Sequence, residues 1–176
     1  SRMPKLIRNG RVVDDSAEIL VLDETQAPEA LTLPEGPVFV PLAVWQAHKG
    51  MLAGRAGVGV WLDSHESVED LAEDLGNLSA VALNFPKFTD GRAYSGAALL
   101  RSRYGFTGEV RAIGDVLRDQ FFFMQRCGFD TLQPKAGKYS DSQLEEAVAS
   151  LKDFSSPYQA AIDQPEPLFR RAQRIA

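Results

Sequence analysis

The chain has 176 residues, of which 44% are hydrophobic and 24% charged, a composition that is typical of a folded globular protein and excludes a disordered chain. Its formal net charge of -5 argues against a general nucleic-acid-binding protein, because such proteins carry a basic surface. One cysteine and two histidines are too few for a disulfide framework or a structural zinc site, so we expect no metal ion.

The N-terminal segment KLIRNGRVVDD, residues 5–15, predicts a β-hairpin. Two short apolar strands flank Asn9-Gly10, a dipeptide that accepts the positive φ angles of a tight turn. A further apolar run follows at 18–23. No apolar run approaches the roughly 20 residues that a membrane-spanning helix needs, and we expect a cytoplasmic protein without a membrane partner.

From residue 38 onward the pattern alternates between strand and helix. We expect strands at 38–42, 58–62, 79–85, 109–114 and 129–133 and helices at 43–55, 67–78, 90–105, 115–128 and 140–154. About five βα units predict an α/β fold with a parallel sheet, either an open doubly wound sheet or a partial barrel. The domain is expected to span 3–154, and 155–176 to form a peripheral helix or a segment that docks on a partner.

Ligands of parallel α/β folds bind beyond the carboxyl ends of the strands, where this chain places several polar residues. Asp63, Ser64 and His65 follow the second of the five strands, and Asp115 follows the fourth. Carboxylates in different surroundings can divide the roles of acid and base. Asp115 and Asp63 are therefore our candidate catalytic residues.

The loop FPKFTDGRAYSG, residues 85–96, carries the densest group of polar residues. Asp90 can cap the following helix, and Gly91 would let a ligand approach the backbone closely. Lys87 and Arg92 would add positive charge to the helix N-terminus, a place that favours anions. The loop predicts an anion-binding site, and the alternative is a well-capped surface helix with solvated cations.

The helix expected at 115–128 carries an apolar face that consists of Val116, Leu117, Phe121, Phe123, Met124 and Cys127. Gln120 falls in the middle of this face, so it is either a hydrogen-bonding residue of the core or points toward the site. Phe122 falls on the opposite face and would be exposed, or covered by the C-terminal segment or a second subunit. Arg101 is expected to be solvated at the end of its helix.

The blocks FPKFTDGRAYS, RAIGDVLRDQ and RCGFD within residues 85–130 resemble the signature of a bacterial family known as domain of unknown function family 934. Members of that family are often encoded beside assimilatory sulfite reductase and are labelled oxidoreductases of sulfite reduction. The resemblance implies a role in sulfur assimilation and cysteine biosynthesis. Tyr94 and Gln120 are among the positions that match the family's motifs, and no catalytic residue of the family is established for transfer.

Three hypotheses follow. The first is an accessory protein of assimilatory sulfite reduction that binds sulfite reductase, another sulfur-assimilation protein or a small anion. The second is a small lyase, isomerase or hydrolase that acts on an anionic metabolite, and the third is a homo-oligomeric scaffold. The expected ligand-binding residues are Lys87, Asp90, Gly91, Arg92, Tyr94 and Gln120. No cofactor is identifiable, because the sequence has no flavin or nicotinamide fingerprint and cannot hold an iron–sulfur cluster with one cysteine.

Overall fold

The computed structural model describes residues 4–154, and the predicted C-terminal segment, 155–176, lies outside the described residues. Strands β1 (Lys5–Arg8) and β2 (Arg11–Asp14) pair antiparallel and confirm the predicted hairpin. Asn9 and Gly10 take up φ angles of 51° and 76°, as the tight turn requires.

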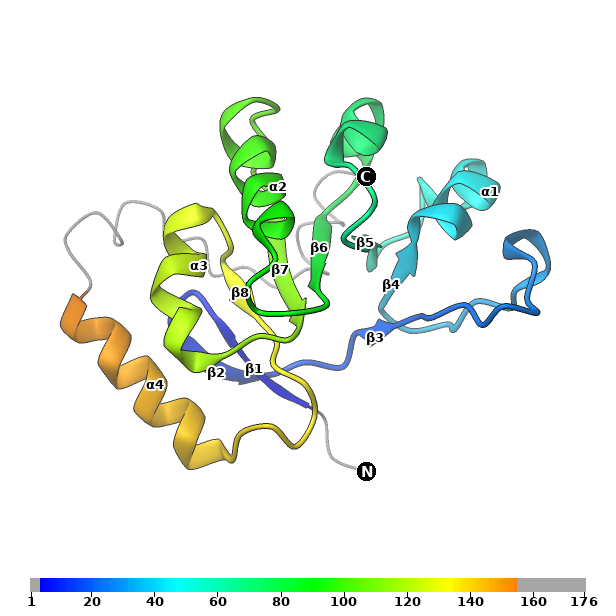
Figure 1. The fold of residues 1–176 in the computed structure, drawn as a ribbon. Helices are drawn as coiled ribbons and strands as arrows, with labels where there is room; N and C mark the ends of the chain where they lie inside the picture. The colour runs from blue at the N-terminus through cyan, green and yellow to red at the C-terminus, as the bar shows by residue number, and fades with distance from the viewer. Residues whose placement is uncertain (1–3, 155–176) are drawn as a thin grey trace.

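Six further strands run parallel to one another: β3 (Glu18–Ile19), β4 (Val38–Pro41), β5 (Val58–Leu62), β6 (Ala80–Phe85), β7 (Glu109–Gly114) and β8 (Thr131–Leu132). The hairpin joins this set because β1 pairs antiparallel with β8, which gives the sheet order β2-β1-β8-β7-β6-β5-β4-β3. Each parallel strand lies beside its predecessor, and the sheet curls into a half-barrel (Figure 1). The doubly wound alternative is therefore wrong, because its strand order reverses at a switch point.

The helical segments are η1 (Pro28–Ala30), α1 (Leu42–Leu52), η2 (Val68–Asn77), α2 (Gly91–Ser102), η3 (Arg118–Gln120), α3 (Phe121–Cys127) and α4 (Asp141–Phe154), where η marks a 3-10 helix. The predicted series of five βα units is confirmed only in part, because a 3-10 helix joins β5 to β6 and α3 begins six residues later than expected. None of the helices in the described part of the chain is long and apolar enough to cross a membrane.

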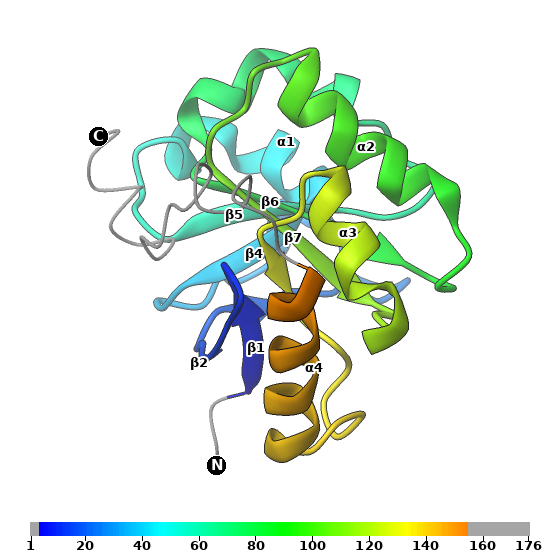
Figure 2. The ribbon, with the colours of Figure 1, turned by 90° about the vertical axis from the view of Figure 1, so that its left-hand side faces the viewer.

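The two faces of the sheet differ in what covers them. One face packs against the helices and forms the main core, with Val60, Val81 and Leu83 facing Leu71, Ala97 and other helical residues. The inner face carries a small cluster of Ala17, Phe39, Ala80, Ala82 and Ile113 that contains no residue of a helix. Figure 2 shows α1, α2 and α3 together on the outer side of the curled sheet.

A network of charged side chains is buried on the inner face. The guanidinium of Arg111 is fully buried and donates to Glu109 Oε2 at 2.8 Å and to Asp15 Oδ2 at 3.0 Å. It also lies 4.6 Å from the ring centroid of Phe39. Arg8 of β1 contacts the same two carboxylates, so two cations balance two anions where solvent cannot screen them.

The strand order explains why Asp15 belongs to this network. Strands β2 and β3 lie at opposite ends of the sheet, yet only residues 15–17 connect them. This link crosses the inner face, and Ala17 packs there against the inner cluster. Asp15 Oδ1 accepts the N–H of Ala17 at 2.7 Å. The Asp15 carboxylate therefore fixes the conformation of the link and also binds the two arginines.

Acidification is expected to destabilise the fold through Asp15. Burial raises the pKa of Asp15, but the Arg111 charge, the Arg8 hydrogen bond and the Ala17 N–H together lower it below its usual value. A carboxyl whose folded-state pKa is depressed stabilises the fold above its unfolded pKa of about 3.9, and this stabilisation is lost as pH falls through the folded pKa. Urea unfolding from neutral pH downward should show this loss in the wild type and a smaller loss in Asp15→Asn. Equal pH dependence of the two proteins would contradict it.

Arg101 binds backbone carbonyl groups of two neighbouring loops, so the prediction that it is solvated is wrong. Its guanidinium donates to the carbonyl oxygens of Gly128 at 3.0 Å, Phe106 at 2.9 Å and Gly108 at 2.7 Å, and it pairs with Asp130. Gly128 has a φ of +120°, and an added Cβ would lie 2.8 Å from Arg101 Cγ. The RCGFD block therefore holds the end of α2 against the turn that follows α3.

Candidate functional site

The loop after β5 holds Asp63 in a fixed position. Asp63 Oδ1 accepts the Ser64 N–H at 2.8 Å and the Asn84 side-chain Nδ2–H at 3.0 Å. The Asp63 N–H donates to Glu66 Oε1 at 2.8 Å, which closes the loop into a turn. Because β5 and β6 are neighbours, the bond to Asn84 ties two adjacent strand ends together. Among the described residues, Asp63 Oδ2 has no hydrogen-bond partner.

Asn84 can occupy this position because residue 114 is a glycine. Gly114 has a φ of +89°, and an added Cβ would overlap Asn84 Oδ1 and lie 2.5 Å from the Phe85 carbonyl oxygen. The next residue, Asp115, accepts the Phe88 N–H through Oδ2 at 2.7 Å and donates its own N–H to Phe85 O at 2.7 Å. This glycine-aspartate pair therefore positions Asn84 and the loop after β6.

Helix α2 begins with an aspartate cap that also binds an arginine. Asp90 Oδ1 accepts the backbone N–H of Arg92 at 2.9 Å and its Nε–H at 3.2 Å, while Oδ2 accepts from Nη2 at 3.0 Å. Hydrogen bonds from Arg92 lower the pKa of Asp90, and Asp90 in turn raises the pKa of Arg92. The Arg92 side chain stays 66% exposed, so it is accessible, but an anion must compete with Asp90 for it.

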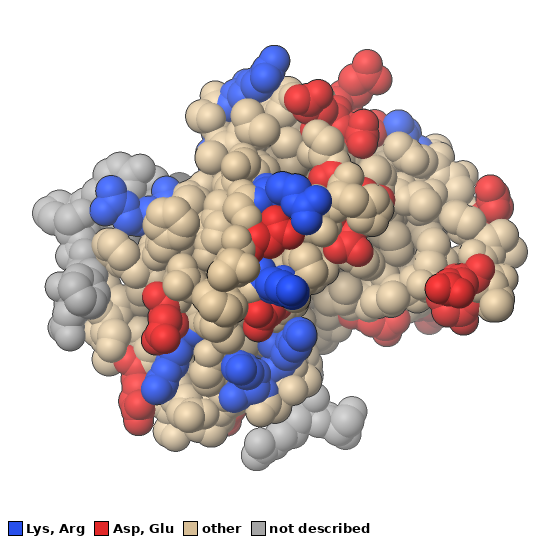
Figure 3. All heavy atoms as spheres, in the orientation of Figure 1, with Lys and Arg blue, Asp and Glu red and all other residues tan. Residues whose placement is uncertain are grey.

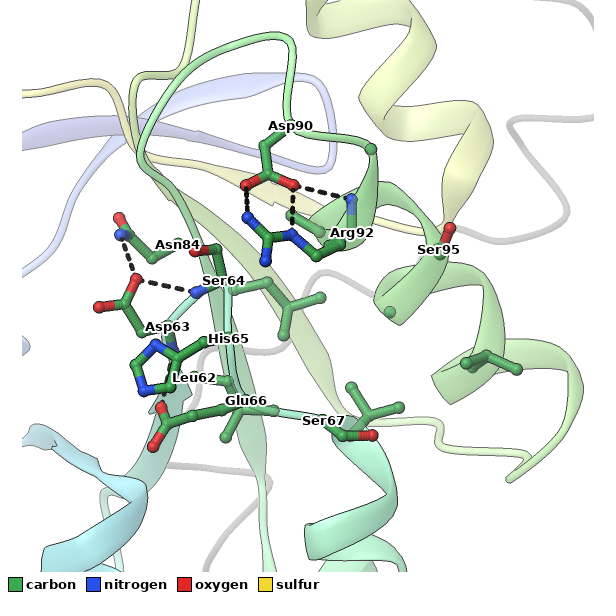
Figure 4. Close-up of a pocket in the computed structure, with 16 residues that line it drawn as sticks. Leu62, Asp63, Ser64, His65, Glu66, Ser67, Asn84, Asp90, Arg92 and Ser95 are labelled. Carbon is green, nitrogen blue, oxygen red and sulfur yellow. Dashed lines mark hydrogen bonds and ion pairs between the residues drawn. The ribbon is translucent and has the colours of Figure 1, made fainter.

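The loop after β5 and the start of α2 form opposite walls of a cleft of about 640 Å³, which we call the α2 cleft (Figure 4). Its polar lining comes from Asp63, Ser64, His65, Glu66, Ser67, Asn84, Asp90, Arg92 and Ser95. Its apolar lining comes from Leu62, Val68, Leu83, Ala93 and Leu99, with Gly91 and Gly96 completing it. The volume lies within the range of small-molecule sites, about 300–1,000 Å³.

The structure brings Asp63, Asp90, Gly91 and Arg92 of the predicted set into this cleft. The fold does not require glycine at position 91, because an added Cβ would meet no protein atom within 4 Å and its φ is not positive. That a ligand approaches the backbone there stays a prediction. Asp115, the other candidate catalytic residue, does not line the cleft and anchors the Phe88 N–H instead. Lys87 is exposed and also lies outside the lining.

Tyr94 and Gln120 lie away from the cleft, between α2 and α3. The Tyr94 hydroxyl donates to Gln120 Oε1 at 3.4 Å, and the Tyr94 ring packs edge-on against Phe85 at 4.9 Å. Burial raises the pKa of Tyr94. Gln120 thus has a partner in the half-buried layer between the two helices, and neither residue shares the α2 cleft with Arg92.

The polar lining residues Glu66, Ser67 and Ser95 were not among the predicted site residues. Ser95 follows Arg92 by three positions on α2, a spacing that places both on one helix face and could have identified it. Glu66 accepts the N–H of Asp63, which lies three residues earlier. The sequence DSHE at residues 63–66 is typical of a turn and could have indicated this bond. The lining carries three carboxylates against one guanidinium, so its charge is mainly negative.

No group of three or more His, Cys, Asp or Glu side chains in residues 4–154 could hold a metal ion. Asp23, which follows the first apolar run, bonds within its own loop and accepts the Thr25 N–H at 2.7 Å.

The fold and the site define an α/β half-barrel protein with a ligand-sized cleft beyond the carboxyl ends of β5 and β6. The chain belongs to the family described as "Bacterial protein of unknown function (DUF934)", whose model matches residues 59–169. This match confirms the resemblance seen in the sequence blocks, and it includes every residue that lines the α2 cleft. No curated protein and no solved structure matches the chain.

Proposed function

We propose that the protein is an accessory protein of assimilatory sulfite reduction that acts in the cytoplasm and holds a small molecule in the α2 cleft. The observation that carries the ligand-binding part is the place of this cleft, beyond the carboxyl ends of two parallel strands. The link to sulfite reduction is supported by the association of the family with sulfite reductase genes. A reductase subunit is the partner that this role implies.

The size and charge of the cleft support a ligand larger than sulfite. A bare sulfite ion would fill a small part of about 640 Å³. Arg92 can bind one anionic group, whereas the carboxylates of Asp63, Glu66 and Asp90 require hydrogen-bond donors or positive charge. We therefore propose a metabolite that combines one anionic group with hydroxyl or amino groups.

Binding of small sulfur anions tests this proposal. Taurine joins a sulfonate to an ammonium group, so it should bind the wild type at least about tenfold more tightly than sulfite in calorimetric titration. Arg92→Gln should weaken taurine binding by about tenfold or more, because the sulfonate loses its cation. Lys87→Gln is the matched control, since Lys87 lies outside the cleft and should leave the affinity unchanged. Equal effects of the two variants would contradict the assignment of Arg92.

A second candidate function, catalysis by Asp63, is favoured by one observation. Asp63 is fixed through Oδ1, while Oδ2 has no partner among the described residues, and His65 lines the same cleft. A carboxylate held in this way can act as a general base in a lyase, isomerase or hydrolase. Under this function Asp63→Asn would abolish turnover of a bound metabolite while binding persists, whereas a binding protein would show no turnover in either form.

A further inference from the structure

Two stretches of the chain differ in charge, and we call residues 14–79 the acidic half and residues 80–140 the basic half. Residues 14–79 contain 13 Asp and Glu against two Lys and Arg, whereas residues 80–140 contain nine Lys and Arg against five Asp and Glu. The parallel strands follow one another in sequence order, so most residues of the two halves lie in different parts of the sheet, although Asp15 contacts Arg111. Helix α4, which packs against α3, lies outside both halves and adds Asp141, Glu145 and Glu146. Figure 3 shows blue and red side chains intermixed over the part of the surface near α2, α3 and α4, and mainly red ones at the right-hand side, where the N-terminal elements lie.

The basic half also exposes aromatic rings. Phe122 and Phe123 of α3 are 36% and 50% exposed, which corrects the prediction that Phe123 faces the core. Phe122 and Arg126 lie four positions apart on α3, with the Arg126 guanidinium 5.7 Å from the Phe122 ring centroid, and Arg118 precedes them in η3. We call Arg118, Phe122, Phe123 and Arg126 the α3 face. In Figure 2, α3 lies toward the viewer between α2 and α4.

Part of the α3 face is held rigidly by the core. The Phe123 ring packs on Tyr94 with the ring centroids 4.8 Å apart, and Tyr94 packs on the buried Phe85 at 4.9 Å. An aromatic ring fixed in this way loses little conformational entropy when a partner covers it. Exposed aromatic side chains beside arginine are the residues that dominate binding energy at protein interfaces.

The arginines of the α3 face keep their charge available. No carboxylate of the described residues lies within ion-pair distance of Arg126. Arg118 makes an exposed contact of 3.8 Å with Glu146, and its guanidinium lies 6.0 Å from the Tyr139 ring centroid. By contrast, Arg111 and Arg8 are neutralised in the buried network. Exposed and unneutralised cations steer a partner of opposite charge and select against a basic one.

We propose that the α3 face is the docking surface for an acidic protein segment that carries apolar side chains. The acidic groups would meet Arg118 and Arg126, and the apolar groups would cover Phe122 and Phe123. The face lies on the α3 side of α2 and shares no residue with the α2 cleft, so the proposal does not depend on what that cleft binds. A second copy of this chain is the competing occupant, since its own acidic half could supply the carboxylates.

The test uses the full chain, labelled for NMR, and a synthetic peptide of about 15 residues in which Asp and Glu alternate with Leu and Phe. We expect chemical-shift changes confined to η3, α3 and the adjoining part of α2, and weaker binding as salt rises. Arg126→Glu and Phe122→Ser should each weaken binding by about tenfold. Arg103→Glu, at the exposed end of α2, is the charge-matched control and should leave binding unchanged.

Three results would overturn the proposal. The first is a peptide with Lys in place of Asp and Glu that binds equally well, and the second is a set of shifts that lies away from α3. The third is sedimentation of the free protein as a dimer that Arg126→Glu dissociates, which would assign the face to a second copy. Retained dispersion of the NMR spectrum shows that each variant is folded.

Discussion

Replacing Arg111 with methionine is expected to lower the free energy of unfolding by about 3–5 kcal/mol, the usual cost of removing one partner from a buried ion pair. The change leaves Glu109 and Asp15 buried with only Arg8 to balance them. It also frees the link at 15–17 that crosses the inner face of the half-barrel. Equilibrium unfolding in urea measures the effect.

An exposed ion pair serves as the control for this experiment. Lys5 and Asp14 pair across the hairpin at 2.9 Å with side chains that are 35% and 52% exposed. Because solvent screens such a pair, Lys5→Met should cost no more than about 1 kcal/mol. A loss below about 1 kcal/mol for Arg111→Met as well would show that the inner network does not hold the half-barrel together.

Gly114→Ala is expected to damage the cleft although Gly114 itself does not line it. The new methyl group would overlap Asn84 Oδ1, and alanine would have to adopt a φ of +89°, so the strain should cost about 1–3 kcal/mol. Asn84 would move, and Asp63 would lose the 3.0 Å bond that fixes its position. Taurine binding should weaken by about tenfold or more, as measured by calorimetry at a temperature where the variant remains folded.

Gly91→Ala is the matched control within the same site. Its Cβ would meet nothing within 4 Å, and its φ is not in the left-handed region, so the substitution should leave both stability and binding unchanged. If Gly114→Ala bound ligands like the wild type, the support of Asn84 by β7 would be irrelevant to the cleft. If Gly91→Ala abolished binding, the ligand would approach the α2 backbone more closely than we propose.

Local sequence signals predicted the elements that local interactions determine. The Asn9-Gly10 turn is confirmed, and the predicted helix at 140–154 begins with a capping box, in which the Ser140 N–H donates to Gln143 Oε1 at 2.9 Å and the Gln143 N–H to Ser140 Oγ at 3.2 Å. Strand order was not predictable in the same way, because apolar strands suit a doubly wound sheet and a curled one equally. The choice depends on which face the crossovers cover, and no single segment encodes it.

The error at Phe123 has a definite geometrical cause. The helical phase was counted from Asp115, but α3 begins at Phe121 after a loop and the 3-10 turn at Arg118–Gln120. The phase therefore shifted, and a ring assigned to the core became half exposed. A short helix with a 3-10 turn at its start carries no sequence signal as strong as a proline or a capping box.

The candidate site was predictable to the level of a sheet edge. The strand ends indicated that polar residues gather at this edge of the sheet, and Asp63 does meet Asn84 there, because neighbouring parallel strands bring their carboxyl ends together. They could not indicate on which side of α2 each later residue would lie, so Tyr94 was grouped with Arg92 although it faces α3. The density of polar residues at 85–96 reflects several tasks: Asp90 caps α2, Arg92 faces the cleft and Tyr94 joins the aromatic layer.

The most direct test of the central claim is growth on sulfate as the sole sulfur source of a strain that lacks this gene. We expect the wild-type gene to restore growth and the folded Arg92→Gln and Gly114→Ala proteins not to restore it. Added cysteine should restore growth without the gene. The Gly91→Ala gene should restore growth like the wild type. Unimpaired growth of the deletion strain on sulfate would contradict the proposed role in sulfite reduction.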